Sequence, residues 1–221
     1  VPEVGPGAPA ARVGVVGLGY FAYQKFRAQN TNGIVNTNTN AVATPTPSPA
    51  NQNSDGPGEG ERRADLLWIP GGSFQMGRSD GADQEGPSHS VTVEAFSIDR
   101  TEVTNAEYAQ FVQEAGRAAP RHFVNGKPAS GQEMWPVTNV SLDDAKAFAQ
   151  WRSKRDGVTY RLPTEEEWEY AARDGSQGTI FPWGNNWAEG KANVNTASLK
   201  PVGTSADDKT RGGVVDMIGN A

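Results

Sequence analysis

The stretch Arg161-Leu-Pro-Thr-Glu-Glu-Glu-Trp-Glu-Tyr-Ala-Ala-Arg173 is the most informative part of this sequence. Thr164 is a favoured N-cap residue, and Glu167, three positions later, completes a capping box with it. Glu165 and Glu166 add negative charge at the positive end of the helix dipole. The pattern therefore predicts a helix that begins directly after Thr164.

The same helix has one narrow apolar face and a glycine that could end it. Trp168, Ala171 and Ala172 stand at i, i+3 and i+4, so they share that face. Gly175 is the residue type that most often stops a helix. These positions alone leave open whether the segment is only a well-capped surface helix.

The ionisable side chains of the sequence give little indication of acid–base catalysis. Residues 165–169 hold four glutamates, but helix capping and pairing with Arg161 and Arg173 explain them better. The two histidines, His89 and His122, lie far apart, and neither belongs to a metal-binding pattern such as H-E-x-x-H. We expect structural or solvated roles for both histidines.

The rest of the folded part mixes short strands with capped helices. Strands are expected at 66–69 and 72–76 around the turn pair Pro70-Gly71, and one half-buried strand at 90–98. The inward side chains of that strand are expected to be Val91, Val93, Phe96 and Ile98.

Two further helices are expected, one over 105–115 capped by Thr104, and one after Ser141 with Asp144 at the box position. Beyond Gly178 the chain is rich in glycine, asparagine, tryptophan and proline, which is typical of loops that bury aromatic side chains. The mixture predicts an α+β fold with much irregular chain.

A series of motifs accompanies these elements in a fixed order. They are Trp68-Ile-Pro-Gly-Gly-Ser-Phe-Gln-Met-Gly77, Glu85-Gly-Pro-Ser-His89, Thr101-Glu-Val-Thr-Asn-Ala-Glu-Tyr108, Pro136-Val-Thr-Asn-Val-Ser141, Asp144-Ala145, Phe181-Pro-Trp-Gly184, Ala192-Asn193, Pro201-Val-Gly203 and Asp216-Met-Ile-Gly-Asn-Ala221. Together with 161–173, this series resembles the formylglycine-generating enzyme family, also called sulfatase-modifying factors. The resemblance runs from about Leu66 to Ala221 and implies a compact variant of the C-type lectin fold.

Composition limits the function further. The net charge is −6, and no basic stripe interleaved with aromatic residues is present, so a nucleic-acid partner is not expected. The chain has no cysteine, which excludes disulfides, zinc–thiolate sites and a thiol nucleophile within these 221 residues. The apolar fraction of 36% is low for a chain that is folded throughout.

The polar excess lies in residues 28–64, which are rich in asparagine, threonine, proline and glycine. Such a segment buries too little apolar surface to offset its conformational entropy, so we interpret it as a low-complexity linker. Residues 65–221 form the predicted domain, which the resemblance implies is incomplete at its C-terminus.

Residues 13–23 are an uncharged, mostly apolar run followed by Lys25 and Arg27. Gly17-Leu-Gly-Tyr-Phe-Ala22 within it matches the G-x-G-x-x-G/A fingerprint, but no acidic residue stands between Glu3 and Asp55, so we reject a dinucleotide site. A span needs about 20 residues. We therefore interpret residues 1–27 as the remnant of a membrane segment, the alternative being a buried or disordered apolar tail.

The loop-rich C-terminal part offers oxygen ligands for calcium, which prefers carboxylates, amides and backbone carbonyls. In the resembled family, the segments matched here by Ala192-Asn193 and Gly219-Asn220 contribute to calcium sites. The candidate ligands in this chain are Asn193, Val194, Asp207, Asp208 and Asn220. The alternative is that they are ordinary loop residues.

The resemblance also implies which chemistry is missing. The family's oxidases use a pair of cysteines, after a Trp-Glu-Trp that follows Gly-Asn-Ala, to bind copper and engage the substrate cysteine. This chain stops at Ala221 and holds no cysteine, so copper is not expected in it and no catalytic residue is predicted.

We therefore expect a non-catalytic binding or sensing domain, with a protein or small-molecule ligand, on the extracytoplasmic side of a bacterial membrane. The parent protein would be membrane-anchored, for example a protein kinase. The alternative is a fragment of a formylglycine-generating oxidase or of a related iron-dependent sulfoxide synthase.

Overall fold

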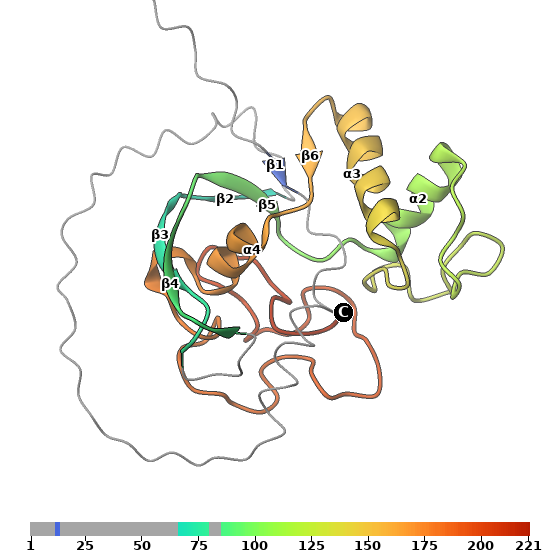
Figure 1. Cartoon of the computed structure of the whole chain (residues 1–221). Helices are drawn as coiled ribbons and strands as arrows, with labels where there is room; N and C mark the ends of the chain where they lie inside the picture. Colours follow the sequence, from blue (N-terminus) through green and yellow to red (C-terminus); the bar gives the residue numbers. More distant parts are fainter. Residues whose placement is uncertain (1–11, 14–65, 80–84) are drawn as a thin grey trace, which may run out of the picture.

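The computed structural model describes residues 12–13, 66–79 and 85–221 (Figure 1). The strands are β1 (Arg12–Val13), β2 (Leu66–Ile69), β3 (Gly72–Met76), β4 (His89–Val93), β5 (Phe96–Asp99) and β6 (Tyr160–Arg161), and the helices are α2 (Asn105–Ala115), α3 (Leu142–Asp156), α4 (Glu165–Ala172) and the 3₁₀ turn η3 (Gly175–Gln177). One sheet has the order β2-β5-β1-β6, and β3 pairs with β4 in a second sheet. In Figure 1 the strands β2 to β5 curve around α4, while α2 and α3 lie to one side. The predicted α+β class is confirmed.

The predicted start of α4 is confirmed. The Thr164 hydroxyl accepts a hydrogen bond from the Glu167 backbone N–H at 3.2 Å, and the Glu167 carboxylate accepts one from the Thr164 N–H at 2.9 Å. Arg161, at the end of β6, donates two further bonds to Glu167 at 2.6 and 2.7 Å. The helix is thus capped and tied to the neighbouring strand by one carboxylate.

Helix α4 buries more side chains than those of the apolar face predicted from the sequence. Ala171 and Ala172 are buried as expected, and Trp168 is half-buried, but Tyr170 is the most deeply buried residue of the helix. The Tyr170 ring packs edge-on against Phe74, with ring centroids 5.3 Å apart, and its hydroxyl donates to the Pro70 carbonyl. Because an aromatic ring outweighs an alanine in apolar area, the helix is rotated to bury the tyrosine.

The prediction that Gly175 ends α4 is wrong. The helix stops at Ala172 with Arg173 as its cap, and Gly175 opens the η3 turn at a φ of 66°. A side chain at Gly175 would meet the Tyr170 ring at 3.3 Å. This glycine is therefore required for close approach to the tyrosine rather than for the helix end.

The prediction of one continuous strand over 90–98 is also wrong. The segment divides into β4, which pairs with β3, and β5, which pairs with β2 in the other sheet. A Cβ at Gly71 would lie 2.6 Å from the Val93 carbonyl oxygen and 2.7 Å from the Ala95 nitrogen, so the β2–β3 turn passes directly over the break. Val93, Phe96 and Ile98 are buried as predicted, and Val91 is half-buried.

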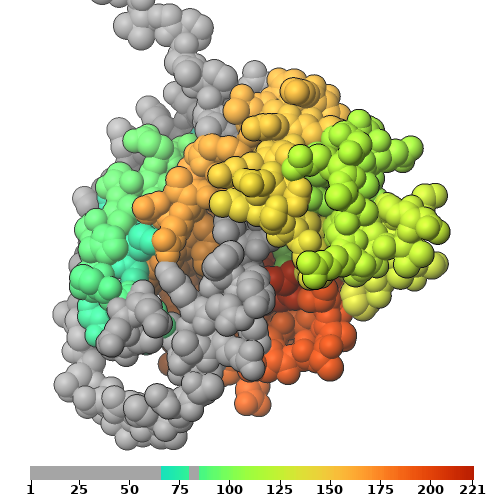
Figure 2. All heavy atoms as spheres, turned by 45° about the vertical axis from the view of Figure 1, so that its right-hand side comes forward, coloured from blue at the N-terminus to red at the C-terminus, as the bar shows by residue number. Residues whose placement is uncertain are grey.

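Helices α2 and α3 enclose a second hydrophobic core. Figure 2 shows the outer surface of these helices in green and yellow. The predicted caps at Thr104 and Ser141 are both present, and Ser141 forms a full capping box with Asp144. Arg152 of α3 is 2% exposed and pairs at 2.5 Å with Asp99 of β5. This buried ion pair joins the helical layer to the larger sheet.

The N-terminal residues enter the fold through a short strand. Arg12 and Val13 pair in parallel with β5 on one side and β6 on the other. The remaining residues of the predicted membrane remnant (1–27) and the whole linker (28–64) lie outside the described residues. Among the described helices, none is long and apolar enough to span a bilayer.

We expect Glu167→Gln to lower the free energy of unfolding at pH 7 by about 1–3 kcal/mol, because a charge-assisted bond to Arg161 and part of the cap are lost. Burial by itself raises the pKa of Glu167, but the bonds from Arg161 and Thr164 outweigh it and lower the pKa below the usual 4.5. The carboxylate therefore stabilises the fold above pH 4.5, and this contribution disappears as pH falls through the lowered value.

Urea unfolding at several pH values checks this prediction. The exposed neighbour Glu166, changed to glutamine, is the matched control and should stay close to the unmodified protein. A deficit of the Glu167→Gln variant that stays the same throughout acid titration, until the protein unfolds, would show that its cause is not the ionised carboxylate.

Candidate functional site

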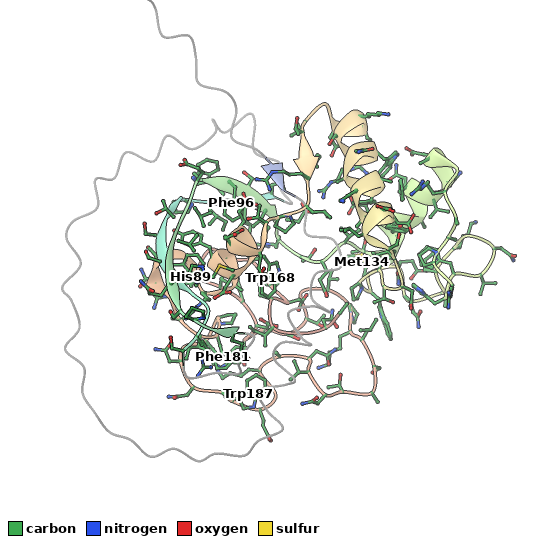
Figure 3. All side chains as sticks on the ribbon, viewed as in Figure 1. His89, Phe96, Met134, Trp168, Phe181 and Trp187 are labelled. Atoms are coloured by element: carbon green, nitrogen blue, oxygen red, sulfur yellow. The ribbon has the colours of Figure 1, made fainter. Side chains whose placement is uncertain are left out.

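The described residues form a cleft of about 410 Å³ between α4 and the β3–β4 hairpin, besides a larger hollow of about 710 Å³ that Asn193, Asn220 and Ala221 help to line. The walls of the cleft are mostly apolar, and Figure 3 labels His89, Trp168 and Phe181 around it. The apolar lining residues are Met76, Pro87, Trp168, Ala172, Ile180, Phe181, Met217 and Ile218. The volume and composition are those of a site for a small ligand or a single large side chain.

An ion pair on α4 holds the cleft together. Glu169 and Arg173 pair at 2.9 Å, one helical turn apart. Glu169 also accepts from the Gly77 N–H at 2.8 Å, and Arg173 donates to the carbonyls of Gln75 and Gly77 at 2.8 and 3.3 Å. The pair thus fastens the helix to the end of β3, and its charges are already matched. Sequence analysis predicted the pairing of Arg173 correctly but not its bonds to the strand.

Among the described lining residues, Glu85 differs from Glu169 because its carboxylate has no hydrogen-bond partner. Its backbone is fixed by a hydrogen bond from the Arg78 N–H to the Glu85 carbonyl oxygen at 2.7 Å. Residue 77 must be glycine for this contact, because it has a φ of 74° and a Cβ there would lie only 2.4 Å from the same oxygen. Both carboxylate oxygens of Glu85 are buried and have no hydrogen-bond donor among the described residues.

Neither histidine provides a catalytic arrangement in the described residues. His89 is exposed at the edge of the cleft, with Nδ1 3.1 Å from the Pro87 carbonyl. His122 contacts the Asn105 side chain at 3.3 Å and does not line the cleft, and burial lowers its pKa. These positions agree with the structural or solvated roles expected from the sequence.

The predicted calcium ligands Asn193 and Asn220 lie together. The Asn193 Nδ2 donates to the Asn220 Oδ1 at 3.0 Å, and the Asn220 N–H donates to the Asn193 carbonyl at 3.1 Å. Both side chains are buried, and the adjacent Val194 is half-buried. The Asn193 Oδ1 accepts a further bond from Thr196 at 2.8 Å.

The two aspartates among the predicted calcium ligands lie in different surroundings. Asp208 is completely buried, and its carboxylate accepts from the N–H groups of Met217 and Ile218 at 3.1–3.2 Å. The side chain of Asp207 is 59% exposed and pairs with Lys191 at the surface. The structure therefore brings Asn193, Val194 and Asn220 together, places Asp208 under the last loop, and leaves Asp207 outside.

Sequence analysis missed one carboxyl group in this region, that of Glu102, which lies near Asp216 of the segment 216–220. Glu102 accepts from the Asn220 Nδ2 at 2.8 Å and from the Ala221 N–H at 2.9 Å, and Asp216 accepts from the Gly203 N–H at 2.5 Å. Burial, followed by the charge of Asp216, raises the pKa of Glu102 to about 9, and burial raises the pKa of Asp208 to about 7. Only the Thr-Glu-Val-Thr motif of the resemblance could have drawn attention to Glu102.

These oxygens are of the type that calcium prefers. No described lysine or arginine forms an ion pair with Glu102, Asp208 or Asp216, so a cation would relieve their mutual repulsion. The described residues nevertheless contain no group of three histidine, cysteine or acidic side chains close enough to hold an ion by themselves. Amide and backbone oxygens would have to complete the shell.

Residues 53–221 match the sulfatase-modifying factor enzyme 1-like domain. The chain therefore belongs to this family, as the ordered motifs predicted. Among solved structures it is similar to PvdO from Pseudomonas aeruginosa, with a TM-score of 0.57 and 31% identity over 69% of this chain and 66% of that one.

The chain is also similar to several curated proteins. The chain is 31% identical to inactive C-alpha-formylglycine-generating enzyme 2 of Bos taurus, over 71% of this chain and 68% of that protein. It is 34% identical to the formylglycine-generating enzyme of Streptomyces coelicolor, over 63% of this chain and 57% of that protein. It is also 30% identical to the serine/threonine-protein kinase Pkn1 of Chlamydia trachomatis, over 71% of this chain but 26% of that protein.

We expect Gly219→Ala to destabilise the loop that holds Asn193 and Asn220. A Cβ at position 219 would lie 2.7 Å from both the Asn193 carbonyl oxygen and the Val194 side chain, so backbone must move. Gly212→Ala is the matched control, because its Cβ would meet Ile69 at an ordinary 3.6 Å. Thermal unfolding should place the first variant several degrees below the second, and equal melting temperatures would contradict the close packing of residues 193 and 219.

Proposed function

We propose that this chain is a ligand-binding domain that carries out no catalysis with its own residues. The observation that carries the proposal is the cleft between α4 and the β3–β4 hairpin, which combines apolar walls with a few fixed polar groups. The absence of cysteine from all 221 residues supports it, because no thiol of this chain can take part in oxidation of a substrate cysteine. A relative of 31% identity is named as inactive.

The cleft is suited to binding because its shape is fixed before a ligand arrives. The Glu169–Arg173 pair fastens one wall to β3, and Tyr170 anchors the same helix in the core. A preformed apolar site avoids the entropy of ordering side chains on binding. Ligand affinity there would come from burial of apolar surface, with polar groups setting orientation.

We further propose that the domain is the extracytoplasmic part of a membrane-anchored bacterial protein such as a protein kinase. The apolar run at 13–23, followed by basic residues and a low-complexity linker, supports this arrangement. The similarity to part of the Chlamydia trachomatis protein named as a kinase supports it as well.

A second candidate function is that the chain forms part of a formylglycine-generating oxidase. The 34% identity to the Streptomyces coelicolor protein of that name favours it. In that case the residues described here would supply the scaffold, and the thiols would have to come from other residues of the parent protein.

To test the binding function, we expect a neutral apolar probe, 2-phenylethanol, to perturb the amide signals of cleft residues in an NMR titration. Ile218→Trp, which fills the cleft, should abolish the perturbation. Val124→Trp, at a site that is 67% exposed and outside the cleft, is the matched control and should retain it. Perturbations elsewhere only, or turnover of a cysteine peptide by the purified chain with copper, would contradict the proposal.

We also propose that calcium binds the loops that hold Asn193, Val194 and Asn220, with Asp208 beneath them. Millimolar calcium should raise the melting temperature by several degrees relative to chelator, since a ligand at a hundredfold excess over its Kd stabilises the native state by roughly 2.7 kcal/mol. Magnesium should be a poor substitute because it demands a tighter octahedral shell.

The Asn193→Ala variant should lose most of the calcium effect. Asn186→Ala, at an exposed position outside these loops, is the matched control. Identical melting curves of the unmodified protein in chelator and in calcium would show that these residues are ordinary loop residues.

A further inference from the structure

We propose that the outer edge of β4, the edge that faces away from β3, binds an extended segment of a partner protein as an added β-strand. One apolar side chain of this segment enters the cleft. The inference rests on the proposed binding function of the cleft and specifies its ligand as a peptide.

The hydrogen bonds of β3 show which backbone groups of β4 face outward. The Gln75 carbonyl points away from β4, because its oxygen accepts a hydrogen bond from Arg173 of α4 at 2.8 Å. In an antiparallel pair, hydrogen-bonded and non-hydrogen-bonded residue pairs alternate along the strands. Ser90 lies opposite Gln75, so this is a non-hydrogen-bonded pair. Ser90, and Thr92 two positions later, therefore direct their N–H and C=O groups to the outer edge.

The side chains of Ser73 and Thr92 support the same alternation. These two residues lie opposite each other, and their hydroxyl oxygens are 2.8 Å apart. Opposite side chains approach more closely in non-hydrogen-bonded pairs than in hydrogen-bonded ones. The contact thus places Thr92 in the outward-facing set independently of Gln75.

The outer edge of β4 is open in the described part of the chain. Ser90 and Thr92 are exposed, and no other described residue forms a hydrogen bond with their outward backbone groups. The outer edge of β3 differs, because the Glu169–Arg173 pair binds its last backbone groups. Proteins usually protect an open edge with lysine, proline or a bulge. Strand β4 has no lysine or proline, and its register is continuous, so its edge is available for pairing.

The regular spacing of the outward groups selects a polypeptide as the occupant. Donors and acceptors recur at every second residue of β4, roughly 7 Å apart, and another β-strand presents the same repeat. A second copy of this chain would offer only another five-residue strand. Such a contact is far smaller than the ~1,200 Å² that stable interfaces bury. A separate peptide strand gains more, because it also reaches the cleft.

The face of the sheet beside this edge leads into the cleft. Side chains alternate between the faces of a sheet, so His89, Val91 and Val93 share one face. His89 lines the cleft, and Val91 is only half-buried. A strand added about 4.8 Å from β4 places every second side chain on this face. The side chain nearest His89 then enters the cleft, whose apolar walls favour a phenylalanine there.

Amide hydrogen exchange of the unmodified chain tests the proposal without any variant. The probe is the peptide acetyl-Thr-Val-Thr-Phe-Thr-Val-Lys-amide, whose valine and phenylalanine side chains share one face. We expect the N–H groups of Ser90 and Thr92 to exchange rapidly in the free chain and at least tenfold more slowly with saturating peptide. The N–H of Val91 points to β3 and should exchange slowly in both states.

Two variants at one position separate edge pairing from other contacts. Thr92→Pro removes an outward N–H but no bond of the β3–β4 hairpin, because proline is tolerated where a strand N–H faces solvent. Thr92→Val keeps the N–H and is the matched control. In NMR titrations, Thr92→Pro should weaken peptide binding at least tenfold, and Thr92→Val should leave it unchanged. Both variants should still bind 2-phenylethanol in the cleft. A peptide with alanine in place of phenylalanine should bind the unmodified chain about tenfold more weakly.

Each failure has a separate meaning. If the alcohol binds the cleft but the peptide leaves exchange at Ser90 and Thr92 unchanged, the edge proposal is wrong and the binding function stands. If neither binds, the binding function itself is contradicted. Slow exchange of both N–H groups in the free chain would also overturn the proposal. If that protection fades on dilution, a second copy occupies the edge, and if it persists, residues of the chain itself do.

Discussion

The ion pair between Glu169 and Arg173 determines both the core and the cleft of this domain. Through Gly77 and Gln75 it fixes α4 against the end of β3. One side of the helix then presents Tyr170 to the core, and the other presents Trp168 to the cleft. An i,i+4 pair on a free helix contributes only a few tenths of a kcal/mol. Here the ion pair stabilises the fold further, because its two side chains also form hydrogen bonds with backbone groups of β3 and Gly77.

The position of α4 has a second cause at its N-terminus. Glu167 caps the helix and binds Arg161, so the direction in which the helix leaves β6 is set by a single buried carboxylate. Arg152 and Asp99 perform the corresponding task between α3 and β5. Charged contacts between elements thus orient a domain whose described strands have at most five residues.

Local signals predicted the parts of this structure that depend on neighbours in sequence. The caps at Thr104, Ser141 and Thr164 and the pairing of Arg161 were all predicted, because each involves residues within about six positions. The break between β4 and β5 depends on Gly71, which is distant in sequence, so periodicity could not reveal it. The cleft was missed for the same reason, since the segments 76–89 and 165–181 that contribute most of its lining are distant in sequence. Family motifs predicted the fold but not this cleft.

The most direct test of the binding role is a crystal structure of the protein grown with 2-phenylethanol. The account predicts the alcohol in the cleft between α4 and the β3–β4 hairpin, with its ring against Trp168. A structure in which residues of the protein itself fill this cleft, or in which the alcohol binds only elsewhere, would contradict it.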